Sequence, residues 1–348
     1  MLLRFCLRFW AFLSVTVISV GVVCVLSLAF FVQLGGTLPN ASHSLTRAKA
    51  MLVDDWWIGR TGHVRPDVDL PCQYLWCQSA SNSSCGDTSC VGCWHCQPKV
   101  HLITYGNSHF KQSKQRLVRE AKQTQWFETV AALGPESLHP SFRSRYARTL
   151  NHTRGGGYWI WKLHIIHQSL ELINEGEFLV YLDAGCTINE RGQQRFVEYI
   201  QLVKRSNYDI LSFQTRYPEH VFTTSRIFDY FNVSTDWSAV RDSGMYIATI
   251  LVMQKGPHLR TWLGLALRAL SDDQGMFTDR DERDSKAADP RFRAPRHDQS
   301  VMSVTRKLVG SVEMPDETWT NAPDVAAWLR AEGGFFGHIP FWSTRIKV

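Results

Sequence analysis

The sequence predicts an α/β domain with a mostly parallel sheet, preceded by a transmembrane helix. Two features predict the α/β domain: short apolar runs that end in turn residues, and longer runs whose apolar residues recur at helical spacing. The two kinds of run alternate after residue 99, which is typical of a sheet covered by helices. A third feature, the apolar segment at residues 9–33, predicts the membrane helix.

The composition narrows the class of protein. The 348 residues include 38 Lys plus Arg and 32 Asp plus Glu, which gives a mild net charge of +6. Charged residues make up 20% and aromatic residues 12%, which excludes a disordered or collagen-like chain. No stretch has the pattern of a basic arm, so we expect no nucleic-acid partner.

The segment at residues 9–33 is long enough to span a bilayer, since roughly 20 apolar residues suffice. A cleaved signal peptide has an apolar core of only about 7–15 residues, so we expect an uncleaved signal anchor. Arg4 and Arg8 precede it and favour a cytoplasmic tail at residues 1–8. Glycosylation triplets follow it at Asn40, Asn82, Asn151 and Asn232. These features predict a single-pass type II protein with a lumenal body.

Residues 34–98 have the composition of a lumenal stem, because they are rich in Ser, Asn, Gly, Pro and Cys and lack a periodic pattern. Six of the nine cysteines cluster there, at Cys72, Cys77, Cys85, Cys90, Cys93 and Cys96. Behind a membrane anchor, disulfides are favoured over zinc binding, and the sequence does not determine their pairing. Cys186 lies far from this cluster, and we expect it to be unpaired.

The domain at residues 99–348 is predicted element by element. Val100–Gly106 is an apolar strand that ends in a turn, and Ser113–Ala132 is a helix that lacks proline and glycine. Glu177–Asp183 is an apolar strand that ends in a carboxylate. The remaining predicted elements are the strands Asp209–Phe213 and Met245–Met253 and the helices Leu259–Leu270 and Gln299–Leu308.

The first candidate site is the carboxylate that ends the strand Glu177–Asp183. Ligands of open α/β sheets bind at the carboxyl ends of the strands. Asp183 could there hold a divalent metal or accept a ribose hydroxyl, and Ala184 and Gly185 would let a ligand approach the backbone. A plain strand-ending turn explains the same residues, because Asp and Gly are common in turns.

The second candidate site is the run Arg154-Gly-Gly-Gly-Tyr-Trp-Ile-Trp-Lys162. Aromatic faces suit the C–H groups of a sugar, and a lysine suits a phosphate. The run is not a Walker loop, since it lacks the Gly-Lys-Ser/Thr ending. The alternative is a tight turn followed by a helix whose Trp161 belongs to the core.

The third candidate site is the run Arg296-His-Asp-Gln-Ser300, which precedes an apolar helix. Asp298 and Gln299 could bond to sugar hydroxyls. The alternative places Asp298 as the N-cap of the helix, a position that Asp often takes.

Taken together, these segments resemble a family of glycosyltransferases of the type A nucleotide-sugar fold (GT-A), a Rossmann-like α/β fold. The family also includes bacterial and viral polysaccharide-synthesis proteins, and the resemblance covers roughly Val100–Val348. The residues that carry it, in chain order, are Thr104–Asn107, Arg116, Glu120, Ala121, Gly155–Lys162, Tyr181–Cys186, Ser225–Phe228 and Arg296–Ser300.

The resemblance implies a role for each matching residue. Asp183 resembles the remnant of the Asp-x-Asp motif that binds the nucleotide and its metal, and Asp298 and Gln299 resemble the pair that reads the donor sugar. Lys162 and Arg154 are candidates for the diphosphate. The predicted catalytic residues are Asp183 and Asp298. The predicted substrate-binding residues are Tyr105, Gly106, Asn107, Arg154, Gly156, Gly157, Trp159, Lys162, Ala184, Gly185, His297 and Gln299.

Two positions depart from the family pattern. Gly185 takes the place of the second Asp of Asp-x-Asp, and Leu163 follows Lys162 where the family usually has Pro. One carboxylate is a poor site for Mn²⁺ or Mg²⁺. A divalent-metal cofactor at Asp183 would therefore need His297, His338 or substrate phosphates as further ligands.

The predicted function is a membrane-anchored glycosyltransferase. It would transfer a sugar from a nucleoside-diphosphate sugar to a glycan, glycoprotein or glycolipid acceptor, and the anchor, stem and lumenal body match the plan of Golgi membrane transferases. An inverting enzyme needs a carboxylate base, for which Asp298, Asp242 and Glu219 are candidates. The missing second Asp leaves an alternative, a catalytically inactive, membrane-anchored sugar-binding protein of the same fold. An adhesion module built on the cysteine cluster would leave the later motifs unexplained.

Overall fold

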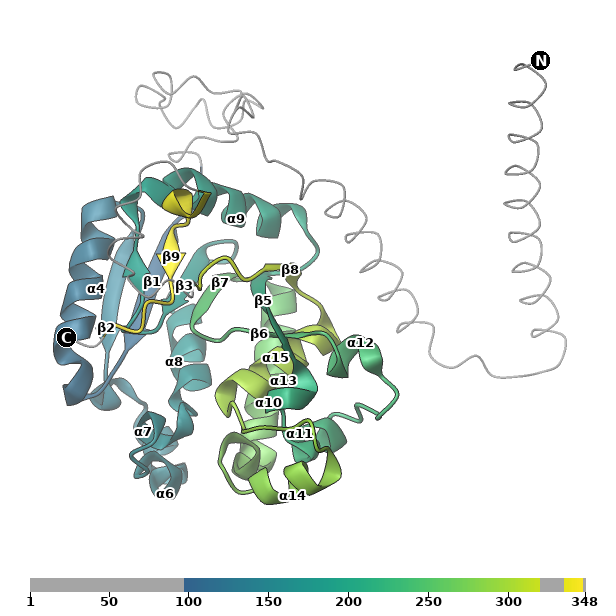
Figure 1. Ribbon diagram of the computed structural model, residues 1–348. Helices are drawn as coiled ribbons and strands as arrows, with labels where there is room; N and C mark the ends of the chain where they lie inside the picture. Colours follow the sequence, from purple (N-terminus) through teal and green to yellow (C-terminus); the bar gives the residue numbers. More distant parts are fainter. Residues whose placement is uncertain (1–96, 320–334, 347–348) are drawn as a thin grey trace, which may run out of the picture. The chain divides into compact units, whose positions relative to one another are not determined.

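A computed structural model of the protein describes residues 97–319 and 335–346 (Figure 1). All of them belong to one of the two units into which the chain divides, residues 67–348. The predicted tail, signal anchor and cysteine cluster lie outside the described residues and stay predictions. Within residues 97–319 and 335–346, no helix combines the length and the apolar character needed to cross a membrane.

The described residues form a central sheet of seven strands in the order β2-β1-β3-β7-β5-β6, with β8 beside β5. The strands are β1 (Val100–Tyr105), β2 (Thr129–Leu133), β3 (Phe178–Leu182), β5 (Ile210–Pro218), β6 (Gly244–Tyr246), β7 (Ile250–Gln254) and β8 (Val312–Pro315). A separate pair joins β4 (Thr187–Ile188) to β9 (Phe341–Trp342) in antiparallel orientation.

The sheet is mixed, so the prediction of a mostly parallel sheet is confirmed only in part: β6 and β7 run against the other five strands. β1 is parallel to β2 and β3, and β8 is parallel to β5. In contrast, β7 is antiparallel to β3 and β5, and β6 is antiparallel to β5. The backbone N–H of Asp183 donates to the carbonyl of Thr249, so β7 starts at the edge where β3 ends and must run back.

Helices cover both faces of the sheet. The helices are α4 (Lys111–Thr124), α5 (Pro140–Arg145), α6 (Ala147–Leu150), α7 (Gly155–Tyr158), α8 (Trp161–Leu170), α9 (Gln193–Arg205), α10 (Glu219–Phe222), α11 (Ser225–Tyr230), α12 (Ser238–Arg241), α13 (Pro257–Asp272), α14 (Glu282–Ala288) and α15 (Asp298–Val309). Short 3₁₀ turns are η4 (Ser108–Phe110), η5 (Pro135–Ser137), η6 (Glu190–Gly192), η7 (Gln274–Phe277) and η8 (Phe335–His338).

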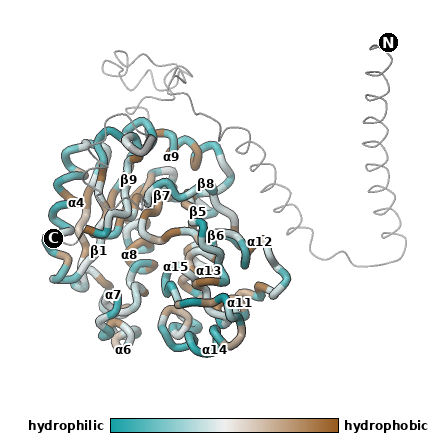
Figure 2. Tube along the Cα trace, viewed as in Figure 1, coloured by the Kyte–Doolittle hydropathy of each residue, from teal (hydrophilic) through white to brown (hydrophobic). Residues whose placement is uncertain are grey.

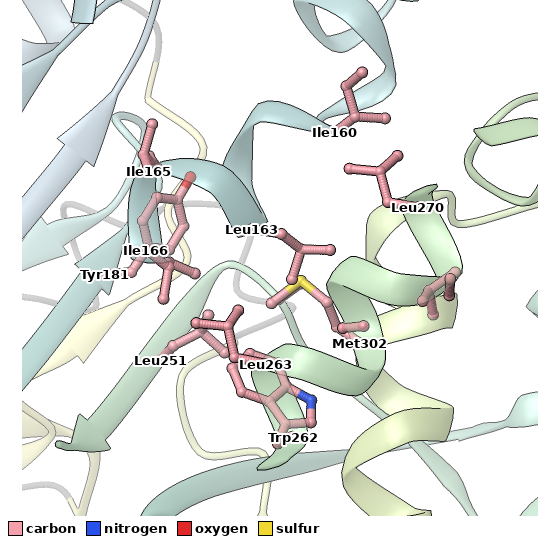
Figure 3. Packing of buried hydrophobic residues seen from close by; sticks show 14 of the residues in the cluster. Ile160, Leu163, Ile165, Ile166, Tyr181, Leu251, Trp262, Leu263, Leu270 and Met302 are labelled. Carbon is pink, nitrogen blue, oxygen red and sulfur yellow. The ribbon is translucent and has the colours of Figure 1, made fainter. Parts of the chain in front are cut away.

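The first face of the sheet packs on α8, α13 and α15. Leu163 of α8, Trp262 of α13 and Met302 of α15 are fully buried there, close to Tyr181 and Leu251 of the sheet (Figure 3). Fully burying an apolar side chain of this size contributes about 1.5–3 kcal/mol. This face therefore fixes α8 and α15, the two helices that begin at candidate sites.

The opposite face packs on α4 and α9. Phe178, Val180 and Leu182 of β3 point to this side, while the alternate residues Leu179 and Tyr181 point to the first face. A strand buried on both faces reads as a continuous apolar run, which is why β3 was recognisable. Figure 2 shows that α4, in contrast, carries mostly hydrophilic residues, as expected of a helix that covers the sheet from outside.

The predicted helix Ser113–Ala132 is wrong in its second half. α4 ends at Thr124, because Gln125 takes a left-handed conformation with φ of 57°. Residues Thr129–Leu133 form β2, which pairs with β1 in parallel. Two β-branched residues, Thr129 and Val130, begin this strand and fit a pleated surface better than a helix.

The other predicted elements are present with altered bounds. The predicted strands at 100–106 and 177–183 are confirmed as β1 and β3, and the helices at 259–270 and 299–308 as α13 and α15. The strand predicted at 209–213 extends to Pro218 as β5. The strand predicted at 245–253 is divided into β6 and β7 by residues 247–249.

Candidate functional site

One cleft of about 1380 Å³ opens at the sheet edge where β1 and β3 end. Of the predicted site residues, all except Gly157 line this cleft. Because β1 and β3 are parallel neighbours, the residues that follow them, Tyr105–Asn107 and Asp183–Gly185, reach the same edge. The cleft therefore brings together four sequence segments. The outermost of them, at Tyr105 and Gln299, are about 190 residues apart in the chain.

The ammonium group of Lys162 lies between the carboxylates of Asp183 and Asp298. Its Nζ is 2.8 Å from Oδ2 of Asp298 and 3.4 Å from Oδ1 of Asp183. It also donates to the carbonyl of Ala248 at 3.0 Å. The Lys162 side chain is 3% exposed and that of Asp298 is 7% exposed, while Asp183 remains 34% exposed. Asp183 is thus the carboxylate that a ligand in the cleft can reach most easily.

The charges of this cluster depend on one another. Burial alone would lower the pKa of Lys162, but Asp183 and Asp298 outweigh it and raise the pKa, so the lysine stays charged. Burial raises the pKa of Asp298, and Lys162 only partly offsets the rise. The Tyr181 hydroxyl donates to Asp183, and burial raises the pKa of Tyr181 well above its ordinary value. Tyr181 therefore acts as a neutral donor that orients the exposed carboxylate.

Arg116 of α4 holds the turn that carries Asp183. Its guanidinium donates to the carbonyls of Ala184 at 3.3 Å and Cys186 at 2.7 Å. Glu120, one helical turn later, pairs with Arg116 at 2.6 Å and accepts from the backbone N–H of Ile188 at 3.0 Å. Two residues of the family motif in α4 thus support the backbone of the site. Cys186 is a free, buried thiol, as expected.

The glycine run forms a left-handed turn. Five consecutive residues, 155–159, have positive φ, including Tyr158 at 55° and Trp159 at 59°. A left-handed conformation costs a residue with a side chain about 1–2 kcal/mol, so it persists only where the surroundings enforce it. At residue 157, where φ is 98°, only glycine also fits the space available, because a Cβ there would lie 2.6 Å from the Cα of Leu150. Gly157 therefore shapes the turn from beneath the cleft.

The turn is tied to the start of α15 through Asp279. The carboxylate of Asp279 accepts from the Arg154 guanidinium at 2.9 and 3.0 Å and from Nε2 of His297 at 2.9 Å. The rings of Tyr158 and Trp159 pack on His297, with centroid distances of 5.3 and 5.5 Å. Burial lowers the pKa of His297 despite Asp279, which keeps the ring neutral at pH 7. Arg154, predicted to bind diphosphate, is thus engaged by Asp279 instead.

Trp161 is a core residue and a cleft residue at once. It is 5% exposed and stacks on Tyr105 with ring centroids 3.8 Å apart. Its indole N–H donates to the carbonyl of Gly155 at 2.9 Å, which braces the left-handed turn. Both interpretations of this tryptophan therefore hold in part.

Asp298 is not an N-cap. His297 caps α15 with φ of 52°, and Asp298 is the first helical residue, without a side-chain hydrogen bond to the helix backbone. Its carboxylate turns instead to Lys162. A carboxylate in the first turn still complements the positive end of the helix dipole.

Two predicted base candidates lie outside the cleft lining. Glu219 is fully buried and bonds to Thr223, Ser303 and Lys307. Asp242 is half exposed and lies beside His220. Neither is positioned to take a proton from a ligand in the cleft, which leaves Asp183 and Asp298.

The carboxylates of the cleft do not fit a divalent cation. Lys162 occupies the position between Asp183 and Asp298, His297 is bonded to Asp279, and His338 is not among the lining residues. Across the described ranges, no group of three or more His, Cys, Asp or Glu side chains could hold a metal ion. Mn²⁺ and Mg²⁺ bind about six oxygen ligands, so Asp183 alone would leave nearly all of them to water and substrate phosphates.

Sequence reasoning missed several cations of the cleft. Arg143, Arg148, Arg296 and Arg345 also line it. Arg296 belongs to a motif that was recognised, so its position could have been inferred. The backbone of Arg345 approaches Gly185, which lies about 160 residues earlier in the chain, and no sequence pattern connects the two.

Comparison with known proteins gives distant likenesses. No protein-family model and no curated protein matches the sequence. A glycosyltransferase that takes part in glycosylation of the major capsid of PBCV-1 is 12% identical, with a TM-score of 0.34 over 70% of this chain and 94% of that one. Mouse xyloside xylosyltransferase 1 is 10% identical, with a TM-score of 0.35 over 70% of this chain and 97% of that one. The galactosyltransferase LgtC is 9% identical, with a TM-score of 0.32 over 71% and 84%. Likenesses of this degree do not identify a reaction.

Proposed function

We propose that the protein is a glycosyltransferase that moves a sugar from a nucleoside-diphosphate sugar to a hydroxyl of a glycan, glycoprotein or glycolipid. The observation that supports this most is the convergence of the three motif segments on one cleft. The lining contains six Lys and Arg side chains, Lys162, Arg143, Arg148, Arg154, Arg296 and Arg345, against the two carboxylates Asp183 and Asp298. Such an excess of positive charge suits an anionic ligand.

The reaction needs three kinds of group, and the cleft contains all of them. The bond between the anomeric carbon and the diphosphate oxygen breaks, and its electron pair leaves with the diphosphate. The cations of the cleft would stabilise that charge. The acceptor oxygen bonds to the anomeric carbon, and its proton passes to a carboxylate, for which the exposed Asp183 is better placed than Asp298. Trp159, which lines the cleft, would offer an aromatic face to the sugar.

The cellular setting of this proposal rests on the sequence. The apolar segment at residues 9–33 and the cysteine-rich stem support a single-pass type II protein of the Golgi membrane with the catalytic body in the lumen. The membrane anchor would then keep the cleft close to glycoconjugates that pass through that compartment.

The test uses the full-length chain in detergent and a panel of nucleoside-diphosphate sugars. Release of the nucleoside diphosphate is measured with and without an acceptor mixture, in EDTA and in Mn²⁺. We expect release with at least one donor, and an Asp183→Asn variant should lower its rate about 100-fold or more. Asp284→Asn is the matched control, because Asp284 is 73% exposed on α14, away from the cleft lining.

Two outcomes would contradict the proposal. Unchanged release by Asp183→Asn would remove Asp183 from the site. Absence of release with every donor under both conditions would refute the transferase. If a nucleoside diphosphate nevertheless bound to the cleft, an inactive sugar-binding protein of the same fold would be favoured.

A further inference from the structure

Two arginines of the cleft, Arg296 and Arg345, have no carboxylate partner within the described ranges. Each packs on an aromatic ring instead, Arg296 on Phe222 at 4.5 Å and Arg345 on Trp319 at 4.7 Å from the ring centroid. Arg154 and Arg116 are engaged, by Asp279 and Glu120 respectively. The two guanidiniums are therefore available to a ligand.

These two positive charges also act on each other. The walls of the cleft lower the pKa of Arg296 even though its side chain reaches solvent, and Arg345 and Arg154 lower the pKa further. Like charges that gather without a counter-ion disfavour one another, and an anion between them would relieve that repulsion. The gathering therefore indicates an anion site.

The backbone of Arg345 occupies the space beside Gly185, the position at which the family pattern has its second Asp. A Cβ at residue 185 would lie 3.1 Å from the Cα of Arg345. The backbone N–H of Ile346 donates to the Gly185 carbonyl at 3.1 Å, and the hydroxyl of Thr344 donates to it at 2.8 Å. The C-terminal segment thus takes up the space beside residue 185, and its Arg345 lines the same cleft.

Lys162 supplies a second positive charge at the neighbouring point. Its ammonium lies between Asp183 and Asp298, where a bridging metal ion would have to bind, and its hydrogen bond to Ala248 fixes it there. A divalent cation held by both carboxylates would lie within a few ångströms of this ammonium and would be repelled by it. The protein itself therefore supplies two cations to this part of the cleft, Arg345 and Lys162.

We propose that Arg296 and Arg345 bind the diphosphate of the donor and that Lys162 takes the place of a divalent metal. This inference rests on the proposed function for the identity of the ligand. It makes the donor site independent of Mn²⁺ and Mg²⁺, and it assigns a binding role to the C-terminal segment of the chain.

The first experiment measures binding of inorganic pyrophosphate to the full-length chain by titration calorimetry in EDTA. We expect binding without metal, and Arg296→Gln and Arg345→Gln should each weaken it about tenfold or more, since each removes charge-assisted hydrogen bonds. Arg283→Gln is the control that removes one positive charge from a side chain that is 96% exposed on α14. Its pyrophosphate affinity should equal that of the wild type.

Binding of pyrophosphate only when Mn²⁺ is present would overturn the proposal, as would equal affinity in all three arginine variants. These readouts do not require transfer activity. Loss of transfer with intact metal-free binding would therefore contradict the proposed function alone.

The second experiment measures Mn²⁺ binding to the full-length chain by electron paramagnetic resonance. The wild type should show no Mn²⁺ signal that depends on Asp183. A wild-type signal that is lost in the Asp183→Asn variant would refute the role of Lys162. Lys162→Met should open the space between the two carboxylates and gain Mn²⁺ binding. If Lys162→Met does not fold, the comparison of the wild type with Asp183→Asn decides the question by itself.

Discussion

Replacing Lys162 by methionine should be among the most destabilising single substitutions in the domain. The change keeps most of the side-chain volume and removes the ammonium that lies 2.8 Å from Asp298 and 3.4 Å from Asp183. At an effective dielectric constant of about 20, the Coulomb attraction is about 6 kcal/mol for the pair with Asp298 and about 5 kcal/mol for the pair with Asp183. Much of this attraction offsets the cost of removing the charged groups from water. Leaving a buried carboxylate without its partner typically costs about 3–5 kcal/mol. For a domain of this size, the melting temperature should fall by about 6–20 °C.

The assay is thermal unfolding of the full-length chain, followed by tryptophan fluorescence. Lys255→Met is the matched control, because the ammonium of Lys255 donates only to a backbone carbonyl, that of Ile173 at 2.9 Å. It should cost about 1 kcal/mol. Adding Asp298→Asn to Lys162→Met should recover part of the loss, because it removes the buried charge that Lys162→Met leaves behind.

The recovery should depend on pH in a defined direction. Burial already raises the pKa of Asp298 above its ordinary 3.8, and loss of Lys162 raises it further. Between 3.8 and that raised value, the native state binds a proton that the unfolded state releases, so stability falls as pH rises. Lys162→Met should therefore be close to the double variant near pH 4 and much less stable than it at pH 7. A Lys162→Met protein within about 1 kcal/mol of the wild type at pH 7 would refute the reasoning.

Two further predictions concern the left-handed turn and its anchor. Gly157→Ala should destabilise the domain by about 1–3 kcal/mol, since residue 157 has a φ of 98° and its new Cβ would collide with the Cα of Leu150. Gly264→Ala, at a helical site with nothing within 4 Å, should stabilise the domain by about 0.5–1 kcal/mol in the same melts. Equal effects of the two substitutions would contradict the strain argument. Asp279→Asn should lower the melting temperature at pH 7, because hydrogen bonding by His297 and the charge of Arg154 outweigh burial and hold the pKa of Asp279 below 3.8. The stability that Asp279 contributes is complete above its pKa in the unfolded state and is lost as pH falls through its lowered pKa in the folded state. The melting temperatures of the wild type and Asp279→Asn, measured from pH 7 to pH 2, should therefore converge at low pH.

Much of the fold was predictable because its central strands are buried on both faces. The runs that became β1 and β3 are mostly apolar and are buried along their whole length, and the turn residues that end them lie at the sheet edge that forms the cleft. α13 and α15 were recognisable for a related reason, since one apolar side of each packs on the sheet. Local pattern and tertiary burial agree in these elements, so the sequence was sufficient.

The errors have a common physical cause, which is that pairing partners are not visible in a local pattern. The helix predicted at Ser113–Ala132 fails after Gln125, because the following five-residue run gains more by pairing with β1 than by continuing a helix. The direction of β7 was missed for the same reason, since only the contact between Asp183 and Thr249 shows where that strand starts. Sequence spacing also identified Lys162 as a cleft residue but could not show that it bridges two carboxylates.

The glycine at residue 185 changes meaning once the C-terminal segment is in place. In the sequence alone, the absence of the second Asp leaves open an inactive sugar-binding protein of the same fold as an alternative to the transferase. In the structure, a side chain at that position would press on the backbone of Arg345, a residue that brings a positive charge to the same cleft. A decaying site would be expected to lose charged groups at random, whereas here the carboxylate is absent, a guanidinium is present, and Lys162 lies between the two remaining carboxylates. The excess of positive charge that results favours a working site for an anionic ligand over a vestigial one.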